Sequence, residues 1–235
     1  MLKAVTLDFW GTLVDDRHGG AAARIDALAK VLPGVSRERV SAAYTVAWAR
    51  FMEAGADGWG LAPAALLSMT LDELAATLRP PAYQAVLSYW ETAHVAHPPR
   101  LLPGVRDMLV ELRRQGLLIA LISDTGATPG SGLRDYLAIH GLRSLLDWVT
   151  FSNETGVTKR QPQAFRVTLA ALGVEAHHAL HVGDTPATDI CGAQAAGLRA
   201  ALTVEIHDRR SPDCHPDFVL EHLADLPAAL ARLSD

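Results

Sequence analysis

Cysteine is scarce in this sequence. Its 235 residues include two cysteines, Cys191 and Cys214. Two cysteines cannot build the disulfide framework that holds many small secreted domains together, and neither belongs to a C-x-x-C pair of the kind found in zinc and redox sites. We therefore expect a reducing, cytoplasmic setting for this chain.

An excess of positive charge and a long apolar run are also missing. Lys and Arg number 21 and Asp and Glu number 26, so the formal net charge is −5. A mildly acidic chain has no overall attraction to nucleic acid or to an anionic membrane. The longest apolar stretch, residues 117–122, has the length of a strand, and the first residues lack the uninterrupted apolar region of a signal peptide. We expect neither nucleic-acid nor membrane partners.

Apolar side chains, by contrast, are plentiful. Apolar residues make up 49% of the chain and charged residues 20%. This balance suffices for a packed core and differs from the composition of disordered chains. A chain of this length is expected to fold into one or two domains.

Short apolar runs alternate with helical patterns through most of the chain. We expect strands at residues 2–8, 117–123, 147–151, 179–182 and 199–204. We expect helices around residues 105–112, 162–172 and 226–233, where apolar residues recur at helical spacing. Apolar strands that alternate with helices are typical of a parallel sheet covered on both faces. The predicted fold class is α/β, with a doubly wound, Rossmann-like parallel-sheet core.

One long segment, residues 15–98, breaks this alternation. It contains helical patterns and no convincing strand. Residues 70–73 (TLDE) match a capping box, which predicts that a helix begins there. Two prolines, Pro98 and Pro99, punctuate the return to the alternating pattern. We therefore predict an α/β core domain made of residues 1–14 and 99–235, and an inserted all-α cap domain made of residues 15–98.

Polar side chains with related chemistry follow the predicted strands. In a parallel sheet, ligands bind at the carboxyl ends of the strands, so side chains at these ends are expected to converge. The residues concerned are Asp8, Ser123, Lys159, Asp184 and Asp189. Carboxylate oxygens suit Mg²⁺, a lysine neutralises phosphate charge, and an ionised aspartate is a competent nucleophile. This set predicts a site that holds Mg²⁺ and a phosphoryl group.

Four segments carry a resemblance to a known family. They are LDFWGTLV (residues 7–14), LIALIS (118–123), ETGVTKRQPQAF (154–165) and HVGDTPATDICGAQAAG (181–197). In this order they resemble the four motifs of the haloacid dehalogenase superfamily, and the long helical insert is similar to that superfamily's helical cap. The resemblance covers nearly the whole chain, and the four motifs together are specific where each alone is weak.

The resemblance implies catalytic roles for three residues. Asp8 matches the nucleophile that forms a covalent aspartyl intermediate. Ser123 matches the hydroxyl that bonds the transferring group, and Lys159 matches the lysine that pairs with the nucleophile and with that group.

The resemblance also implies a Mg²⁺ site. Asp8, the backbone carbonyl of Trp10 and Asp184 match the metal ligands, and Asp189 matches an acidic residue at or just behind the metal. We further expect three residues of the first motif, Trp10, Gly11 and Thr12, to contact the substrate, together with Asp124, which directly follows the second motif.

One position departs from the pattern of the family's phosphatases. They usually carry a second Asp, a general acid and base, where this chain has Trp10, and indole cannot shuttle a proton. Haloacid dehalogenases carry an aromatic residue at the corresponding place, so Trp10 favours a dehalogenase. Dehalogenases need no metal and lack the Asp that matches Asp184, so Asp184 favours a phosphatase. Asp15 and Asp16 are candidates for a substitute acid.

We therefore expect a Mg²⁺-dependent hydrolase that acts on a small phosphorylated metabolite through an aspartyl-phosphate intermediate. Two alternatives stay open. One is a 2-haloacid dehalogenase that uses Asp8 as nucleophile, and the other is a weakly active protein that binds a phosphometabolite. Neither the identity of the substrate nor the oligomeric state has a sequence signature.

Overall fold

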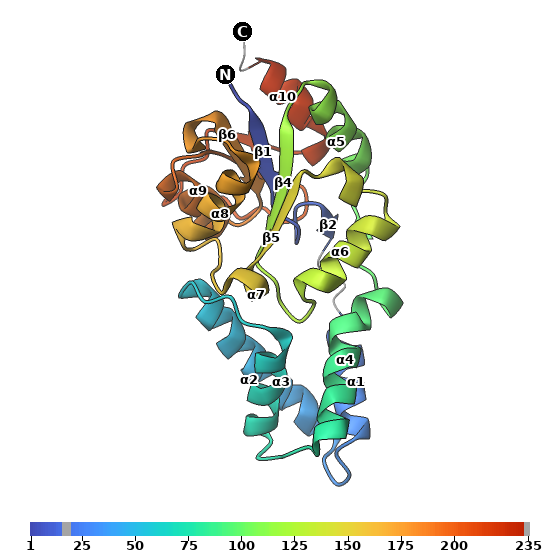
Figure 1. The fold of residues 1–235 in the computed structure, drawn as a ribbon. Coiled ribbons are helices and arrows are strands. Elements are labelled where there is room, and N and C mark those ends of the chain that lie inside the picture. Colours follow the sequence, from blue (N-terminus) through green and yellow to red (C-terminus); the bar gives the residue numbers. More distant parts are fainter. Residues whose placement is uncertain (16–19, 233–235) are drawn as a thin grey trace.

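A six-stranded parallel sheet forms the centre of the computed structural model, which describes residues 1–15 and 20–232 (Figure 1). The strand order is β5-β4-β1-β6-β7-β8, and every neighbouring pair is parallel. The strands are β1 (Ala4–Leu7), β4 (Leu118–Ser123), β5 (Trp148–Phe151), β6 (Ala179–Gly183), β7 (Arg199–Thr203) and β8 (Phe218–Leu220). The predicted strands correspond to the first five of these, whereas β8 was not predicted.

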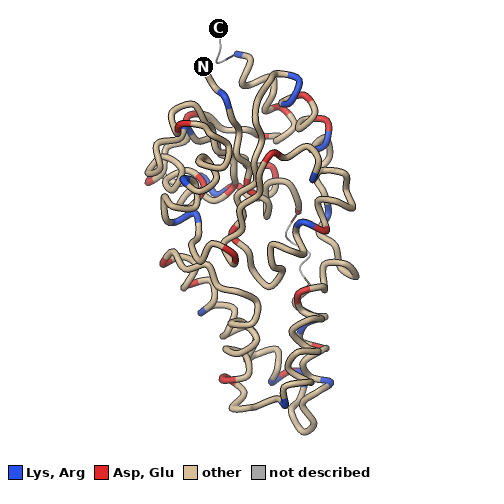
Figure 2. Tube along the Cα trace, viewed as in Figure 1, with Lys and Arg blue, Asp and Glu red and all other residues tan. Residues whose placement is uncertain are grey.

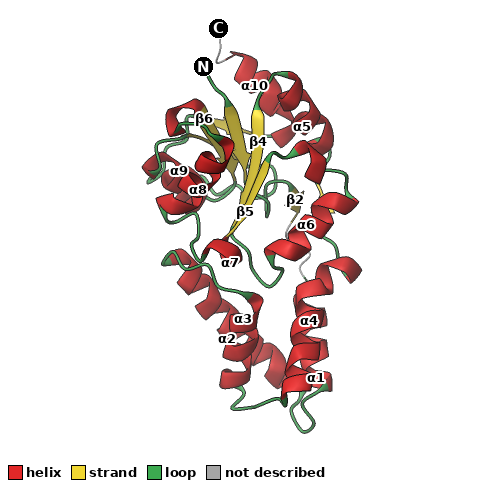
Figure 3. Cartoon of the chain, viewed as in Figure 1, coloured by secondary structure: helices red, strands yellow, loops and turns green. Residues whose placement is uncertain are grey.

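Helices cover both faces of the sheet (Figure 3). One face carries α5 (Val105–Arg114), α6 (Gly130–Ile139) and α10 (Leu226–Arg232), and the other carries α8 (Pro162–Leu172) and α9 (Cys191–Ala195). Successive side chains of a strand point to opposite faces, so Val5 and Leu7 join one apolar cluster and Ala4 joins the other. The doubly wound, Rossmann-like α/β fold is therefore confirmed.

Shorter helical segments complete the connections between these elements. They are α7 (Ser152–Thr155), η1 (Arg143–Leu145), η2 (Ala176–His178), η3 (Pro186–Ile190) and η4 (Leu223–Asp225).

Four helices lie together beyond the carboxyl ends of the strands (Figure 1). They are α1 (Ala21–Lys30), α2 (Arg37–Ala56), α3 (Pro63–Glu73) and α4 (Pro80–Ala96). These helices have an apolar cluster of their own, in which Leu28, Leu66 and Trp90 are fully buried. No strand is present within residues 20–98. This arrangement suits an inserted helical unit, and the division at residues 14/15 and 98/99 stays a prediction.

A two-stranded antiparallel ribbon stands where the chain leaves the sheet region and returns to it. β2 (Val14–Asp15) pairs with β3 (Arg100–Leu101). Within this ribbon, Arg100 Nη2 donates a hydrogen bond to Asp15 Oδ2 at 3.1 Å. Strands of two residues are too short to give a hydrophobic period, so the sequence patterns did not predict them.

The capping-box prediction at residues 70–73 is wrong. Helix α3 already begins at Pro63, a residue that suits the first turn of a helix. Thr70 lies inside this helix, and its hydroxyl donates to the carbonyl oxygen of Leu66 at 2.7 Å. A Thr hydroxyl can bond the backbone one turn earlier as well as cap a helix start, so the pattern did not distinguish the two cases.

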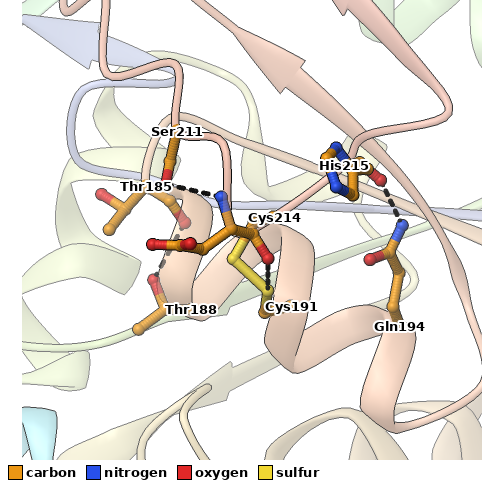
Figure 4. The surroundings of a disulfide bond; sticks show 8 residues. Thr185, Thr188, Cys191, Gln194, Ser211, Cys214 and His215 are labelled. Atoms are coloured by element: carbon orange, nitrogen blue, oxygen red, sulfur yellow. Dashed lines mark hydrogen bonds between the residues drawn. A yellow bond between two sulfur atoms is a disulfide. The ribbon is translucent and has the colours of Figure 1, made fainter.

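Cys191 and Cys214 form a disulfide bond (Figure 4). Cys191 begins α9, and Cys214 lies between β7 and β8, at a sequence separation of 23. Beside the bond, Gln194 Nε2 donates to the carbonyl oxygen of His215 at 2.6 Å. The bond does not agree with the reduced thiols that a reducing setting implies.

Charges of both signs are interspersed along the chain. Figure 2 shows Lys and Arg among Asp and Glu in the sheet region and in the helical end. None of the helices in the described part of the chain is long and apolar enough to cross a membrane.

Candidate active site

Three neighbouring strands bring polar side chains to one edge of the sheet. Asp8 directly follows β1, Ser123 is the last residue of β4, and Asp184 directly follows β6. β1 lies between β4 and β6. The three residues therefore lie at the same carboxyl edge, which faces the helices α1–α4 (Figure 1).

Lys159 links two carboxylates at this edge. Its Nζ lies 2.5 Å from Asp8 Oδ1 and 2.5 Å from Asp189 Oδ1. All three side chains are buried. The lysine's backbone is fixed as well, because Lys159 N donates to Asp124 Oδ1 at 2.9 Å. Lys159 thus contacts three other predicted site residues directly: Asp8, Asp124 and Asp189.

Both oxygens of the Asp189 carboxylate have hydrogen-bond donors. Oδ1 faces Lys159 Nζ and also His181 Nε2, which is 3.1 Å away, and Oδ2 accepts from Thr185 N at 2.9 Å. Burial lowers the pKa of His181, so its ring is neutral at pH 7. Since a carboxylate only accepts, Nε2 carries the proton and Nδ1 accepts from the Thr6 hydroxyl at 2.8 Å. These contacts turn Asp189 toward the lysine.

The burial of this cluster sets its electrostatics. Burial raises the pKa of Asp8 to about 8, with Asp189 and Asp184 adding to the effect and Lys159 opposing it. Burial also raises the pKa of Asp184 to about 6. For Lys159, burial opposes the charge, but Asp189 and Asp8 outweigh it and raise the pKa. For Asp189, Lys159 and the hydrogen bond from His181 outweigh burial and lower the pKa.

Three of these carboxylates could hold a metal ion. One oxygen from each of Asp8, Asp184 and Asp189 lies within 4.8 Å of the others, and all three residues are buried. When ionised, these carboxylates exceed the charge of Lys159 by two, and by one while Arg209 pairs with Asp184. A divalent cation that took the place of Arg209 would balance them. Carboxylate oxygens are the donors that Mg²⁺ prefers, so the donor set fits this ion.

Two glycines make the close packing of these carboxylates possible. Gly11 has a φ of +72°, and a Cβ there would stand 2.5 Å from Asp184 Oδ2. A Cβ on Gly183 would stand 2.2 Å from Asp189 Cγ. Any larger residue at either position would displace a carboxylate of the site.

The remaining predicted residues surround Asp8 and the cavity described below. Thr12 is fully buried, and its hydroxyl donates to Asp8 Oδ2 at 3.1 Å. Ser123 is also buried, and its hydroxyl has no hydrogen-bond partner among the described residues. Trp10 packs edge-on against Phe9, and it lines the cavity together with Asp124. Burial raises the pKa of Asp124 to about 6.

One of the two candidates for a substitute acid lies within the described part of the chain. Asp15 lies in β2, buried, with its carboxylate bonded to Arg100. Asp16 lies outside the described residues.

Arg209 is a cation at the site that the sequence analysis missed. Its Nη1 donates to Asp184 Oδ2 at 2.6 Å and to Thr185 Oγ1 at 2.8 Å. Arg209 lies between β7 and β8, on the segment that the disulfide at Cys214 ties to α9. Arg209 lies outside the four motifs, and only the folding of the chain brings it next to Asp184.

A cavity of about 650 Å³ extends from the strand ends to the helical insert. Its polar end is lined by Asp8, Lys159, Asp184 and Asp189. The helical insert contributes mainly apolar and aromatic residues, among them Trp48, Phe51, Met52, Trp59 and Leu61. This volume suits a small-molecule ligand.

Backbone contacts hold the helical insert against the loop that carries Lys159. Gly60 N donates to Gly156 O at 2.9 Å, and Thr158 N donates to Gly58 O at 3.0 Å. A Cβ on Gly60 would stand 2.0 Å from the carbonyl oxygen of Ser152, so the close approach requires glycine. The sequence analysis did not predict this contact.

Comparison with known proteins identifies the family. Residues 2–197 match a family model described as haloacid dehalogenase-like hydrolase. This chain belongs to that family. The match includes all four motifs on which the resemblance rested.

Two curated relatives are phosphatases by name. A phosphoserine phosphatase from Thermus thermophilus is 35% identical over 126 residues, which cover 54% of this chain and 49% of that protein. A ribulose-1,5-bisphosphate 5-phosphatase from Halopiger xanaduensis is 32% identical over 134 residues, which cover 54% of this chain and 55% of that protein. The chain thus spans about half the length of these relatives.

Solved structures of two enzyme types share the fold. A HAD phosphatase from Thermococcus onnurineus matches with a TM-score of 0.73 and 22% identity, over 97% of this chain and 98% of that one. A 2-haloacid dehalogenase from Pseudomonas syringae pv. Tomato DC3000 matches with a TM-score of 0.69 and 24% identity, over 99% of this chain and 100% of that one. At this level of identity, the likeness concerns the fold alone.

Proposed function

We propose that this member of the family is a Mg²⁺-dependent phosphohydrolase that acts on a small phosphorylated metabolite through an aspartyl phosphate on Asp8. One observation carries the proposal: Lys159 bridges Asp8 and Asp189, with Asp184 beside them, at the edge of the sheet that opens into the cavity. A nucleophile, a cation for phosphate and carboxylates for a divalent metal are thereby available in one place.

The reaction would proceed in two steps. An oxygen of Asp8 attacks the phosphorus, and the bond to the leaving oxygen breaks with its electrons going to the leaving group. Water then attacks the phosphorus of the aspartyl phosphate, which releases phosphate and restores the carboxylate. Lys159 stabilises the charge of the transferring group, and the free hydroxyl of Ser123 supplies a further donor.

The metal would be held by Asp8, Asp184 and the backbone carbonyl of Trp10. When bound, Mg²⁺ supplies positive charge beside the transferring phosphoryl group. Asp189 would lie just behind the metal, because both of its oxygens already accept hydrogen bonds. We assign Thr12 to positioning the nucleophile, and Gly11 to the close approach that brings Asp184 in.

A dehalogenase is the second candidate, and two observations favour it. Trp10 provides an aromatic wall beside Asp8, and Arg209 already neutralises Asp184 without a metal. In that reaction Asp8 attacks the carbon that bears the halogen, halide leaves, and water hydrolyses the resulting ester.

One screen separates these functions. Phosphate esters, acyl phosphates and 2-haloacids are incubated with the protein, with and without Mg²⁺, and released phosphate and halide are measured. Phosphate release that requires Mg²⁺ and is lost in Asp8→Asn supports the proposal, with Asp107→Asn on the surface of α5 as the control. Halide release without Mg²⁺ would contradict the phosphohydrolase proposal and support the dehalogenase reaction. Binding of a phosphometabolite with neither product would favour the weakly active binding protein.

The domain division and the location of the protein are also proposals. A chain in which a short linker replaces residues 15–98 should remain a folded α/β core with reduced selectivity among substrates. If that core unfolds, the two parts are not separate domains. A cytoplasmic location requires that the Cys191–Cys214 bond can form or persist in the cytoplasm. Alkylation of free thiols directly after lysis would measure the fraction of the protein in which the bond is formed.

A further inference from the structure

Arg24 is a buried cation at the helical end of the cavity. It lies on α1, is 6% exposed, and lines the same cavity as Asp8. Its Nε donates to the carbonyl oxygen of Trp90 at 3.2 Å, and its Nη2 donates to Thr128 Oγ1 at 3.0 Å. The hydroxyl of Tyr44 is a further neighbour, and it is neutral. Among residues 1–15 and 20–232, no carboxylate pairs with this guanidinium.

A buried guanidinium without a counter-charge is costly in a protein interior. Of its five N–H groups, two make the hydrogen bonds to Trp90 and Thr128, and the Tyr44 hydroxyl accepts from a third. Two N–H groups remain on the Nη atoms, and they can donate to the oxygens of an anionic ligand. This geometry matches a carboxylate or a phosphate that the cavity admits.

His94 adds a second unsatisfied group next to Arg24. It lies on α4, one turn after Trp90, and lines the cavity. A Cβ on Gly132 would stand 2.6 Å from His94 Cε1 and 3.1 Å from Thr128 Cγ2, so these two side chains are neighbours. The buried His94 Nε2 has no hydrogen-bond partner among the described residues.

The protonation of His94 follows from its other nitrogen. Nδ1 lies 3.1 Å from the carbonyl oxygen of Glu91, which only accepts, so Nδ1 carries the proton. Burial lowers the pKa of His94, so the ring is neutral and Nε2 is an acceptor. Neutral His94 adds no second positive charge, so a phosphate with two negative charges would be matched by Arg24 alone. A carboxylate, with one charge, matches a single guanidinium.

We propose that Arg24 and Thr128 form a second subsite, which binds a carboxylate on the leaving group of the substrate. The inference rests on the phosphohydrolase proposed above and narrows its substrate to phosphate esters of carboxylic acids. Such an ester would place its phosphoryl group at Asp8 and its carboxylate at Arg24.

The cavity also indicates what joins the two ends of the substrate. The same cavity is lined by aromatic residues of α2 and of the segment after it, among them Trp48, Phe51 and Trp59. An apolar or aromatic body would bury its surface against these rings. An aryl ester would also suit Trp10, because a phenolate leaves without the protonation that an alkoxide requires.

Phosphotyrosine and tyramine phosphate form a suitable pair of probes, because they differ in the carboxylate alone. We expect wild-type kcat/KM to be about 10- to 100-fold higher for phosphotyrosine, the range of a charged hydrogen bond in a buried site. Arg24→Gln should reduce this ratio toward one, chiefly through KM. Arg24→Lys keeps the charge without the fork and should give an intermediate ratio. Arg37→Gln, an exposed arginine on α2, is the matched control and should keep the wild-type ratio.

A binding measurement separates this subsite from the proposed reaction. Calorimetry with 3-phenylpropionate, which has an aromatic body and a carboxylate but no phosphate, needs no turnover. Binding to wild type that is lost in folded Arg24→Gln supports the subsite even if no phosphate is released from any ester. Thermal melts show whether each variant is folded, and Arg24→Lys replaces Arg24→Gln if the latter is not.

Three outcomes would overturn the inference. One is an equal kcat/KM for the two probes in wild type, and another is an unchanged ratio in the Arg24 variants. The third is a preference for a bisphosphate over phosphotyrosine that depends on Arg24, which would assign the subsite to phosphate. In the first two cases, phosphate release from tyramine phosphate would leave the phosphohydrolase proposal standing.

Discussion

Arg209 and Asp184 form an ion pair at the position where a metal ligand is expected, with Nη1 2.6 Å from Oδ2. The arginine side chain is 42% exposed and that of the aspartate 3% exposed. A guanidinium can withdraw into solvent from such a position more easily than the buried Lys159 can. In the proposed phosphohydrolase, the pair would keep Asp184 neutralised until a divalent cation took the place of Arg209.

Removal of Arg209 should strengthen metal binding. In Arg209→Gln, Mg²⁺ no longer competes with a bound guanidinium, and a partly exposed ion pair is worth up to about 1 kcal/mol, or about fivefold in affinity. Calorimetric titration with Mg²⁺ measures the change. Arg210→Gln, which alters the neighbouring arginine that pairs with Asp208 and Glu221, is the control. Weaker Mg²⁺ binding in Arg209→Gln would mean that the arginine supports the metal site.

Mg²⁺ binding should release protons and strengthen as the pH rises. The pKa of Asp184 is raised to about 6 and that of Asp8 to about 8 in the protein without metal. Below these values the carboxylates are protonated, and the metal must displace the protons; above them it binds carboxylates that are already ionised. Mg²⁺ affinity should therefore rise between pH 6 and pH 8, as measured by titration in buffers of different ionisation enthalpy. EDTA should abolish phosphate release, and full activity in EDTA would favour the dehalogenase.

Trp10→Asp should accelerate the hydrolysis of alkyl phosphates. Without an acid at this position, the alkoxide of a sugar phosphate leaves unprotonated, and general acid–base catalysis contributes about 10²- to 10⁴-fold. The substitution should increase kcat for a sugar phosphate much more than for p-nitrophenyl phosphate, whose leaving group needs no proton. Both rates are compared with wild type alongside thermal melts. Rapid wild-type hydrolysis of a sugar phosphate would point to another acid, with Asp15 and Asp16 tested first.

Reduction of the disulfide should destabilise the protein. The bond closes a loop with a sequence separation of 23, which in the chain-entropy model is worth about 3 kcal/mol. Urea unfolding of the wild type with and without reductant measures the difference, and Cys191→Ser with Cys214→Ser is the control that reductant should not affect. Equal stability of the oxidised and reduced wild type would show that the bond contributes nothing to folding.

The sequence predicted the sheet and the polar residues at its edge because both depend on local patterns. The apolar run that becomes β1 ends at Asp8, and the run that becomes β6 ends before Asp184, so the strand and its functional residue are read together. The prediction of Lys159 depended on the order of the motifs as well, because this residue lies on a loop and does not directly follow a strand.

The features that the sequence did not predict depend on contacts between distant segments. Arg24 and Arg209 belong to no motif. Arg24 is distinguished by the absence of a paired carboxylate within residues 1–15 and 20–232, and Arg209 by its contact with Asp184. The bond between Cys191 and Cys214 likewise required the fold to bring two segments together. At Thr70 the local pattern was present, but Pro63 had already begun the helix.

The hydrogen bonds from Gly60 to Gly156 and from Thr158 to Gly58 join the helical insert to the loop that carries Lys159. Movement of the helical insert away from the sheet would break these bonds, one of which is donated by Thr158, the neighbour of Lys159. An open molecule, able to exchange ligands, would therefore hold its lysine loop less firmly than a closed one. If Lys159 acts as proposed, ligand exchange would require the open conformation, and full stabilisation of the transferring phosphoryl group would require the closed one.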